Sequence, residues 1–278
     1  MVSTKALKSW DEIQQFQHAR WIFRGQESEA WDCKTALERC CNGHGVPPRR
    51  RADVERDLYR EFRRAYHQYS SHVPAQEAIV EWMALMQHYG APTRLLDFTY
   101  SIYVAAYFAV EKSSPDQDAA IWAVNCVWAL KATMARLSSG GKKKKDFDRL
   151  PKKFLEPTES IVQPLFMQPP YVKVVCPINA FLLNERLRIQ KGVFLIPGNI
   201  EATFMDNLLA MPGHKREENL IKIIIPAKEC REMRKRLFDM NITRRSLFPG
   251  LEGYAQALGI YHPVFDLDDP LRWNPTDE

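Results

Sequence analysis

The stretch QHYGAPTRLLDFTYSIYVAAYFAV, residues 87–110, decides the fold. His88 stands at the predicted end of one helix, Arg94 lies in the turn that follows, and Asp97 comes shortly after. Residues 101–113 are apolar on almost every side, which is typical of a buried helix. Charged groups beside a core are either paired or functional. The residues alone leave two readings open: an ion-paired turn that locks the core, or one wall of a binding cleft.

The rest of the chain mixes helices and strands without a regular alternation. Amphipathic patterns predict helices over the ranges 9–19, 52–70, 75–90 and 227–241, the first with a capping box from Ser9 to Glu12. Runs of β-branched and aromatic residues predict strands over the ranges 20–26, 171–178, 192–197 and 219–226 and a central strand within 118–130, with a short helix after it as an option. The range 94–100 is either a strand or a turn. This order favours an α+β fold with a mixed sheet core and flanking helices.

Composition sets the outer limits of the prediction. The chain has 278 residues and a net charge of +5, which permits an anionic partner without requiring one. No apolar run approaches the roughly 20 residues that span a bilayer, and the N-terminus lacks the pattern of a signal peptide. We therefore expect a cytoplasmic protein without membrane contact. Its six cysteines lack zinc-finger spacing, so we expect reduced structural thiols rather than a metal or redox site.

Standard catalytic motifs are absent from the sequence. It contains neither a phosphate-binding glycine loop nor the dinucleotide-binding glycine pattern, and neither HExxH nor GxSxG occurs. The seven histidines show no convincing metal spacing. The candidates that remain are polar residues that interrupt apolar elements, and such residues must be either hydrogen-bonded or functional.

Three further positions stand out on these grounds. Arg24 ends a predicted strand, where a guanidinium suits phosphate or carboxylate recognition or an internal ion pair with Asp97. Gln190 precedes a glycine and an apolar strand, so its amide could orient a substrate or cap the strand, with the charges of Arg186 and Arg188 nearby. Glu252 lies in a Pro-Gly turn region and reads as a turn acid, with catalysis the less favoured option.

Four segments together resemble the FRG domain family, which is named for its (F/Y)RG motif. FRGQ, residues 23–26, matches the naming motif. The range 87–109 is similar to the longest signature of the family, with Phe98 where tryptophan is usual. NERLRIQKGVFLI, residues 184–196, and SLFPGLEGYAQAL, residues 246–258, are similar to its two later segments.

The resemblance implies one FRG-type domain over 1–278 with a core at about 10–258. We expect a flexible lysine-rich insertion at about 138–153 and a polar tail at 263–278. It further implies a fold like that of ADP-ribosyltransferases, enzymes that cleave the nicotinamide bond of NAD and transfer ADP-ribose. NAD would then be the co-substrate, with no metal.

In that comparison, five residues would bind the NAD: Arg24, Gly25, Tyr89, Thr93 and Arg94.

The same comparison implies the catalytic residues. Arg24 and His88 would act from the early part of the chain, and Gln190 would take the place of the late acidic residue, with Glu252 in reserve. A neutral amide at Gln190 can hold a ribose hydroxyl but supplies no negative charge to an oxocarbenium-like transition state. This weakens the transferase reading and favours slow hydrolysis or binding alone.

The sequence thus supports two main hypotheses. The first is an NAD-cleaving ADP-ribosyltransferase-like enzyme or NAD glycohydrolase that acts as a toxin or phage-defence effector on a protein or nucleic-acid acceptor. The second is a non-catalytic module that binds a nucleotide or phosphate-bearing small molecule. A third, nucleic-acid binding through PPRRR and KKKK, is disfavoured by the mild net charge and the lack of a recognised motif.

Overall fold

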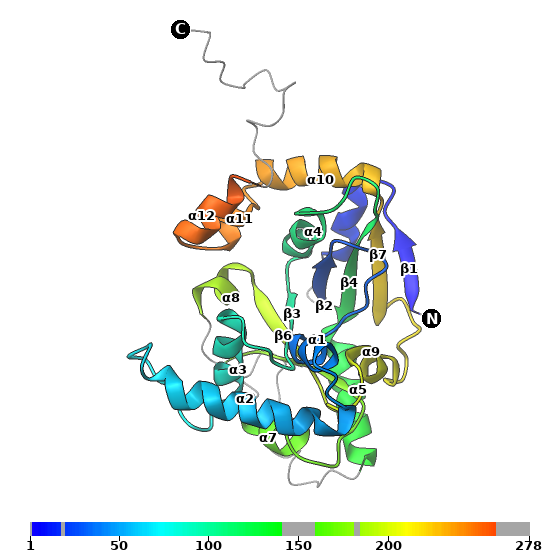
Figure 1. The fold of residues 1–278 in the computed structure, drawn as a ribbon. Coiled ribbons are helices and arrows are strands. Elements are labelled where there is room, and N and C mark those ends of the chain that lie inside the picture. Colours follow the sequence, from blue (N-terminus) through cyan, green and yellow to red (C-terminus); the bar gives the residue numbers. More distant parts are fainter. Residues whose placement is uncertain (1, 18–19, 141–158, 181–183, 260–278) are drawn as a thin grey trace.

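A central mixed sheet organises the protein (Figure 1). The computed structural model describes residues 2–17, 20–140, 159–180 and 184–259. Within these residues the strands form one seven-stranded sheet of order β1-β7-β4-β2-β3-β6-β5, in which β1 and β7 run parallel and the other neighbours antiparallel. Their bounds are β1 Ser3–Ala6, β2 Trp21–Gln26, β3 Leu96–Thr99, β4 Ala119–Asn125, β5 Val175–Ile178, β6 Gly192–Pro197 and β7 Leu220–Ile225.

The helices surround this sheet. Two short 3-10 helices, η1 Trp10–Phe16 and η2 Pro48–Arg50, precede longer elements. The α-helices are α1 Ala36–Gly43, α2 Arg51–Tyr66, α3 Ile79–His88, α4 Ile102–Val110, α5 Cys126–Ser139, α7 Glu159–Phe166, α8 Glu185–Ile189, α9 Phe204–Leu209, α10 Ala227–Asp239, α11 Arg244–Leu247 and α12 Leu251–Ala257. The α+β prediction is therefore confirmed.

Alternate side chains of the strands divide the core into layers. On β2, Phe23 packs with α4 and Ile22 packs with α5 and α9, because successive side chains of a strand point to opposite faces. On β6, Phe194 packs with α3 and α7, while Leu195 joins Ile22. One face of the sheet is thus covered in two parts, by α4 and by the α3–α7 pair, and the other by α5 and α9. Figure 1 shows α4 with α10 beside it, apart from the group of α2, α3 and α7.

The sheet is weakly joined at its middle. β2 and β4 are in register over six residue pairs, from Trp21 opposite Asn125 to Gln26 opposite Ala120. β2 and β3 share one pair, Phe23 opposite Thr99. Beyond that pair the ends of the two strands diverge, and the division between the two helix groups falls at the same place.

Gly25 allows α4 to approach β2 at backbone distance. A Cβ atom at this position would overlap the carbonyl oxygen of Ala105 and would crowd the amide nitrogen of Ala109, both in α4. A glycine at the end of a predicted strand indicates either a turn or a close backbone approach. The structure shows the second, and the close neighbour is helix α4.

Most predicted elements are present, and a few expectations are wrong. The first helix is a short 3-10 segment in which the Ser9 side chain makes no capping bond; instead Glu12 accepts a hydrogen bond from the backbone N–H of Lys8. β1 and α9 were not predicted, since each is short and has little periodicity. The lysine-rich insertion lies largely outside the described residues, apart from 138–140, and so does the polar tail at 263–278.

Replacing Gly25 tests the contact between β2 and α4. We expect Gly25→Ala to lower the free energy of unfolding by about 3 kcal/mol or more, at the upper end of overpacking effects, because backbone atoms rather than a flexible side chain must move. Gly43→Ala is the matched control, since a Cβ there meets no atom within 4 Å and alanine favours a helix. Urea denaturation of both variants measures the difference, and equal stabilities would contradict the assignment.

Candidate functional site

A cleft opens where β2 and β3 part. Its volume is about 790 Å³, within the range of small-molecule sites. Arg24 to Gln26 of β2 form one wall, and Asp97 and Phe98 of β3 form the opposite wall. The loop after β2, the first turn of α1, the end of α4 and helix α8 complete the lining. The divergence of two neighbouring strands therefore creates a cavity inside the sheet region rather than on its outer surface.

Three arginines line this cleft. The Nη1 of Arg24 donates to the backbone oxygen of Asp97 across the split at 2.8 Å, while its buried Nε–H has no hydrogen-bond partner among the described residues. Burial and the charge of Arg24 lower the pKa of Arg39, and burial lowers the pKa of Arg186. No ion pair to these three arginines is found in the described parts of the chain. Unpaired guanidiniums that crowd one another favour the binding of an anion.

Carboxylates share the cleft with the arginines. Asp97 is exposed on the β3 wall, and its charge opposes the effect of burial on the pKa of Arg186. Burial raises the pKa of Glu27, and the charge of nearby Glu111 adds to this effect. Glu111 itself is buried and paired with Arg244. Asp97, Glu27 and Asp32 are thus the acids of the cleft that have no ion pair among the described residues.

His88 lies in a smaller recess that adjoins the cleft. The two cavities share Asp97, Arg186 and Gln190 in their walls. Partial burial, and then the positive charge of Arg186, lower the pKa of His88. The Nε2 of Gln190 donates to the backbone oxygen of Leu247 at 3.1 Å, so its amide connects α8 to α11. Arg24 and His88 therefore line two adjacent cavities, and Gln190 lines both.

Arg94 lines neither of these cavities, which corrects the expectation that it contacts the ligand. Its side chain is 2% exposed and forms a bidentate pair with the Glu55 carboxylate of α2. Its Nη1 also donates to the backbone oxygen of Phe166 at 2.7 Å. Asp97, the nearest acid in the same segment, lines the cleft and does not pair with Arg94. Arg94 thus fastens α2 and α7 to the segment that leads into β3.

Thr93 is also structural. It is 1% exposed, and its hydroxyl donates to the side-chain oxygen of Gln87 at 2.5 Å and accepts from the N–H of Leu95. Thr93, which the resemblance assigned to NAD binding, is thus buried in the turn and does not line the cleft. These bonds close the turn between α3 and β3, so the polar turn both locks the core and, through His88 and Asp97, lines the cavity.

The other predicted positions are divided between the cleft and its surroundings. Gly25 lines the cleft through its backbone. Tyr89 is 67% exposed, lies outside the lining, and has its ring 4.8 Å from that of His88. Glu252 is exposed on α12 and accepts a hydrogen bond from Gln256 at 3.0 Å. Glu252 is outside the lining, but its charge partly opposes the lowering of the pKa of Arg186 by burial.

The sequence reading overlooked several residues of the site. Glu27 directly follows the FRGQ segment, Glu111 places a charge at the end of an otherwise apolar helix, and Trp31 is 52% exposed at the cleft. The charge at Glu111 was an available signal. Arg39 offered none, because its helix lies in a different segment and only the folded chain brings it beside Arg24.

The described residues contain no metal-type cluster of three or more His, Cys, Asp or Glu side chains. The six cysteines are free thiols. Burial raises the pKa of Cys33 and of Cys176 to about 12, so both are neutral at physiological pH. None of the helices in the described ranges combines the length and apolar character that crossing a membrane requires.

Comparison with known families identifies one domain in the chain. Residues 19–118 match the family model of the FRG domain. The chain carries an FRG domain. The matched range of the FRG domain holds β2, β3 and α4, and with them Arg24, Glu27, Asp97 and both sides of the split. No curated protein and no solved structure shows a significant match to the chain. Arg186 and Gln190 reach the cleft from beyond the matched range.

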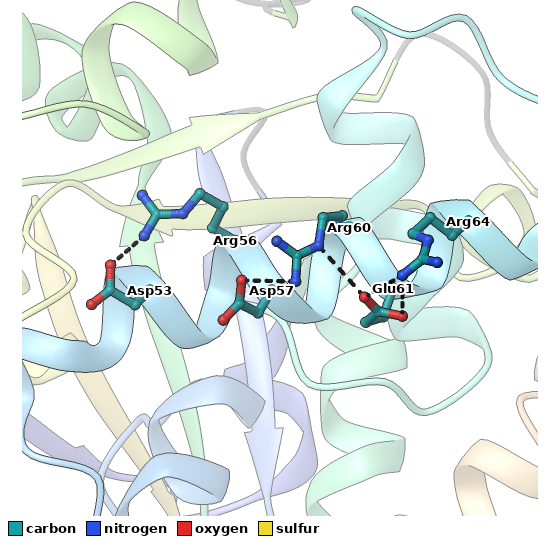
Figure 2. A network of polar contacts seen from close by, with 6 residues as sticks. All are labelled: Asp53, Arg56, Asp57, Arg60, Glu61 and Arg64. Carbon is teal, nitrogen blue, oxygen red and sulfur yellow. Dashed lines mark hydrogen bonds and ion pairs between the residues drawn. The ribbon is translucent and has the colours of Figure 1, made fainter.

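The buried pair of Arg94 and Glu55 is expected to be essential for stability. Arg94→Met should lower the free energy of unfolding by about 3–5 kcal/mol, because it leaves the Glu55 carboxylate buried without a partner. Arg64→Met is the control: Arg64 pairs with Glu61 on the exposed face of α2, in the row of ion pairs shown in Figure 2. An exposed pair contributes about 0–1 kcal/mol. Chemical denaturation measures both, and a loss below 1 kcal/mol for Arg94→Met would contradict the structural role.

The pKa of His88 reports the positive charge of the cleft. We expect an NMR titration to give a value below the ordinary value of 6.5 in the native protein. Arg186→Gln should raise this pKa but leave it below 6.5, because partial burial still disfavours the imidazolium. Arg188→Gln, on the exposed side of the same helix, should leave it unchanged. A native pKa of His88 at or above 6.5 would refute its placement in a partly buried recess beside Arg186.

Proposed function

We propose that the FRG domain cleft binds NAD and cleaves the bond between its ribose and nicotinamide. The observation that carries this proposal is the meeting of three unpaired arginines, Arg24, Arg39 and Arg186, with the open carboxylate of Asp97 in one cavity. A dinucleotide carries a doubly charged pyrophosphate next to ribose groups. Its binding site therefore needs arginines for the pyrophosphate and, close to them, a carboxylate for the ribose.

The arginines suit the pyrophosphate. Guanidiniums form bidentate, charge-assisted hydrogen bonds with phosphate oxygens. Arg24 is already oriented by its bond to the Asp97 backbone, and its buried Nε–H is still unsatisfied among the described residues. Burial, and then repulsion by the charge of Arg24, lower the pKa of Arg39. A phosphate bound between the two guanidiniums would offset their repulsion, which makes phosphate binding more favourable.

The carboxylate suits the reaction. As the bond between C1′ of ribose and the nicotinamide nitrogen breaks, nicotinamide leaves with the electron pair and positive charge develops on the ribose. Asp97, exposed on the β3 wall, would stabilise that charge, and an oxygen of water or of an acceptor would then form the new bond to C1′ and release its proton. Glu27 would accept this proton more readily than Asp97, because burial raises the pKa of Glu27.

Aromatic side chains can hold the bases. Trp31 is 52% exposed in the lining, and Phe108 lies at the end of α4 on the other side of β2. Flat rings stack on exposed aromatic faces. The volume of about 790 Å³ is large enough for a ligand bigger than a single small metabolite.

A non-catalytic nucleotide-binding module is the second candidate, and Gln190 is the observation that favours it. Gln190 stands where ADP-ribosyltransferases would have their late acidic residue, but its amide is neutral and donates to the Leu247 backbone. It therefore supplies no negative charge to the reaction. Nucleic-acid binding has less support. Within PPRRR, Arg50 pairs with Asp53 and Arg51 is buried against Asn42, while the KKKK run lies outside the described residues.

If the chain cleaves NAD, depletion of NAD or modification of an acceptor would make it a toxin or phage-defence effector. This role belongs to the proposal and depends on turnover.

Separate measurements of binding and turnover test the proposal. Calorimetry with NAD should show binding that Arg24→Gln weakens about 10- to 100-fold, the effect of losing a charge-assisted hydrogen bond. Chromatography should show release of nicotinamide, which Asp97→Asn should slow about 100- to 1,000-fold with little change in binding. Asparagine keeps the backbone oxygen that orients Arg24. Arg216→Gln, on an exposed loop away from the cleft, is the control for both assays.

The outcomes separate the two candidates. Binding without nicotinamide release would refute the enzyme and leave the nucleotide-binding module. No binding of NAD, or equal binding by the native protein and Arg24→Gln, would refute the assignment of the cleft to NAD.

A further inference from the structure

A second, smaller cavity lies between α4, α10, α11 and α12. Its volume is about 250 Å³. Three arginines, Arg234, Arg244 and Arg245, line it together with Tyr107 and the ring of Tyr254. In Figure 1 the helices α10, α11 and α12 lie together above the level of α8, at the side of α4. The cavity shares no lining residue with the NAD cleft in the described part of the chain.

The charges of this cavity are unbalanced. Its described lining contains three guanidiniums and no carboxylate. Arg234 is held by the backbone oxygen of Val110 at 2.9 Å and by Ser113 at 3.2 Å, both neutral partners. Arg245 is exposed and stands over the Tyr254 ring, 5.2 Å from its centroid. Two of the three positive charges therefore have no ionic partner among the described residues.

The third arginine is shared with the cleft. Arg244 pairs with Glu111 at 2.5 Å, and their side chains are 16% and 6% exposed. Tyr107 donates its hydroxyl to the same Glu111 oxygen at 2.9 Å. Glu111 also lines the NAD cleft, whereas Arg244 and Tyr107 line the second cavity. One buried ion pair thus separates the two cavities, and an anion in the second cavity would compete with Glu111 for Arg244.

We propose that this second cavity binds a small phosphate monoester that carries an aromatic or other flat group. The dianionic phosphate would bind Arg234, Arg244 and Arg245 through charge-assisted hydrogen bonds, which are the strongest that arginine makes. The flat group would pack on Tyr254 and Tyr107, since such rings favour contact with a planar partner. The volume admits a small molecule of this kind and excludes a dinucleotide.

Calorimetric titration of the whole chain with phenyl phosphate, and with inorganic phosphate, tests the site. Phenyl phosphate should bind more tightly than inorganic phosphate. Arg245→Gln should weaken its binding at least about 10-fold, and because Arg245 is exposed the fold should be unaffected. Arg24→Gln in the NAD cleft and Arg216→Gln on the surface should leave the affinity unchanged.

A second variant tests the competition with Glu111. Glu111→Gln removes the charge that competes for Arg244 and keeps an oxygen for the Tyr107 hydroxyl, so it should tighten phenyl phosphate binding about 3- to 10-fold. Thermal unfolding checks that this variant is folded. No binding of phenyl phosphate, or binding lost in Arg24→Gln but kept in Arg245→Gln, would overturn the proposal. Weaker binding by folded Glu111→Gln would overturn the competition. None of these results depends on whether the cleft takes NAD.

Discussion

The short pairing of β2 with β3 is the constraint on which the site depends. A single residue pair, Phe23 opposite Thr99, joins the two halves of the sheet. Strands that diverge leave backbone and side-chain groups without their usual neighbours, and such groups must be satisfied in another way. Arg24 does this in part, because its guanidinium bonds to the Asp97 backbone across the gap. The same residue that joins the two walls also presents charge to the cavity between them.

Each wall is fixed from behind, which allows the gap to persist. Gly25 brings β2 into backbone contact with α4, and the adjacent β4 pairs with β2 along its whole length. On the other wall, the Arg94–Glu55 pair and the bonds of Thr93 hold the turn that leads into β3. Binding sites supported by rigid elements keep their geometry better than sites on free loops. The residues of the long signature segment are therefore divided between holding the wall and lining the cleft.

The predictable part of this structure was local. Periodicity identified the buried helix α4, the strand ending at Arg24 and the amphipathic α2, because these signals lie within a few residues of each other. Roles that depend on a distant partner were not predictable: Arg94 was expected in the cleft because its partner, Glu55, lies in a helix far away in the sequence. Arg39 was missed for the same reason. The resemblance to the FRG family grouped the segments of Arg24, His88 and Gln190, and these residues line two adjacent cavities.

The mixture of charges in the cleft limits what it can bind. Arginines alone would attract any polyanion, but Asp97 and Glu27 repel phosphate that lies too close to them, so an anionic ligand must place its charge near Arg24 and Arg39 and a neutral or electron-poor group near the acids. Glu111 is paired with Arg244, so its charge opposes the ligand less than the charges of the unpaired acids do. Because Glu111 lines the cleft and Arg244 lines the second cavity, this ion pair connects the charge of the cleft to residues outside it.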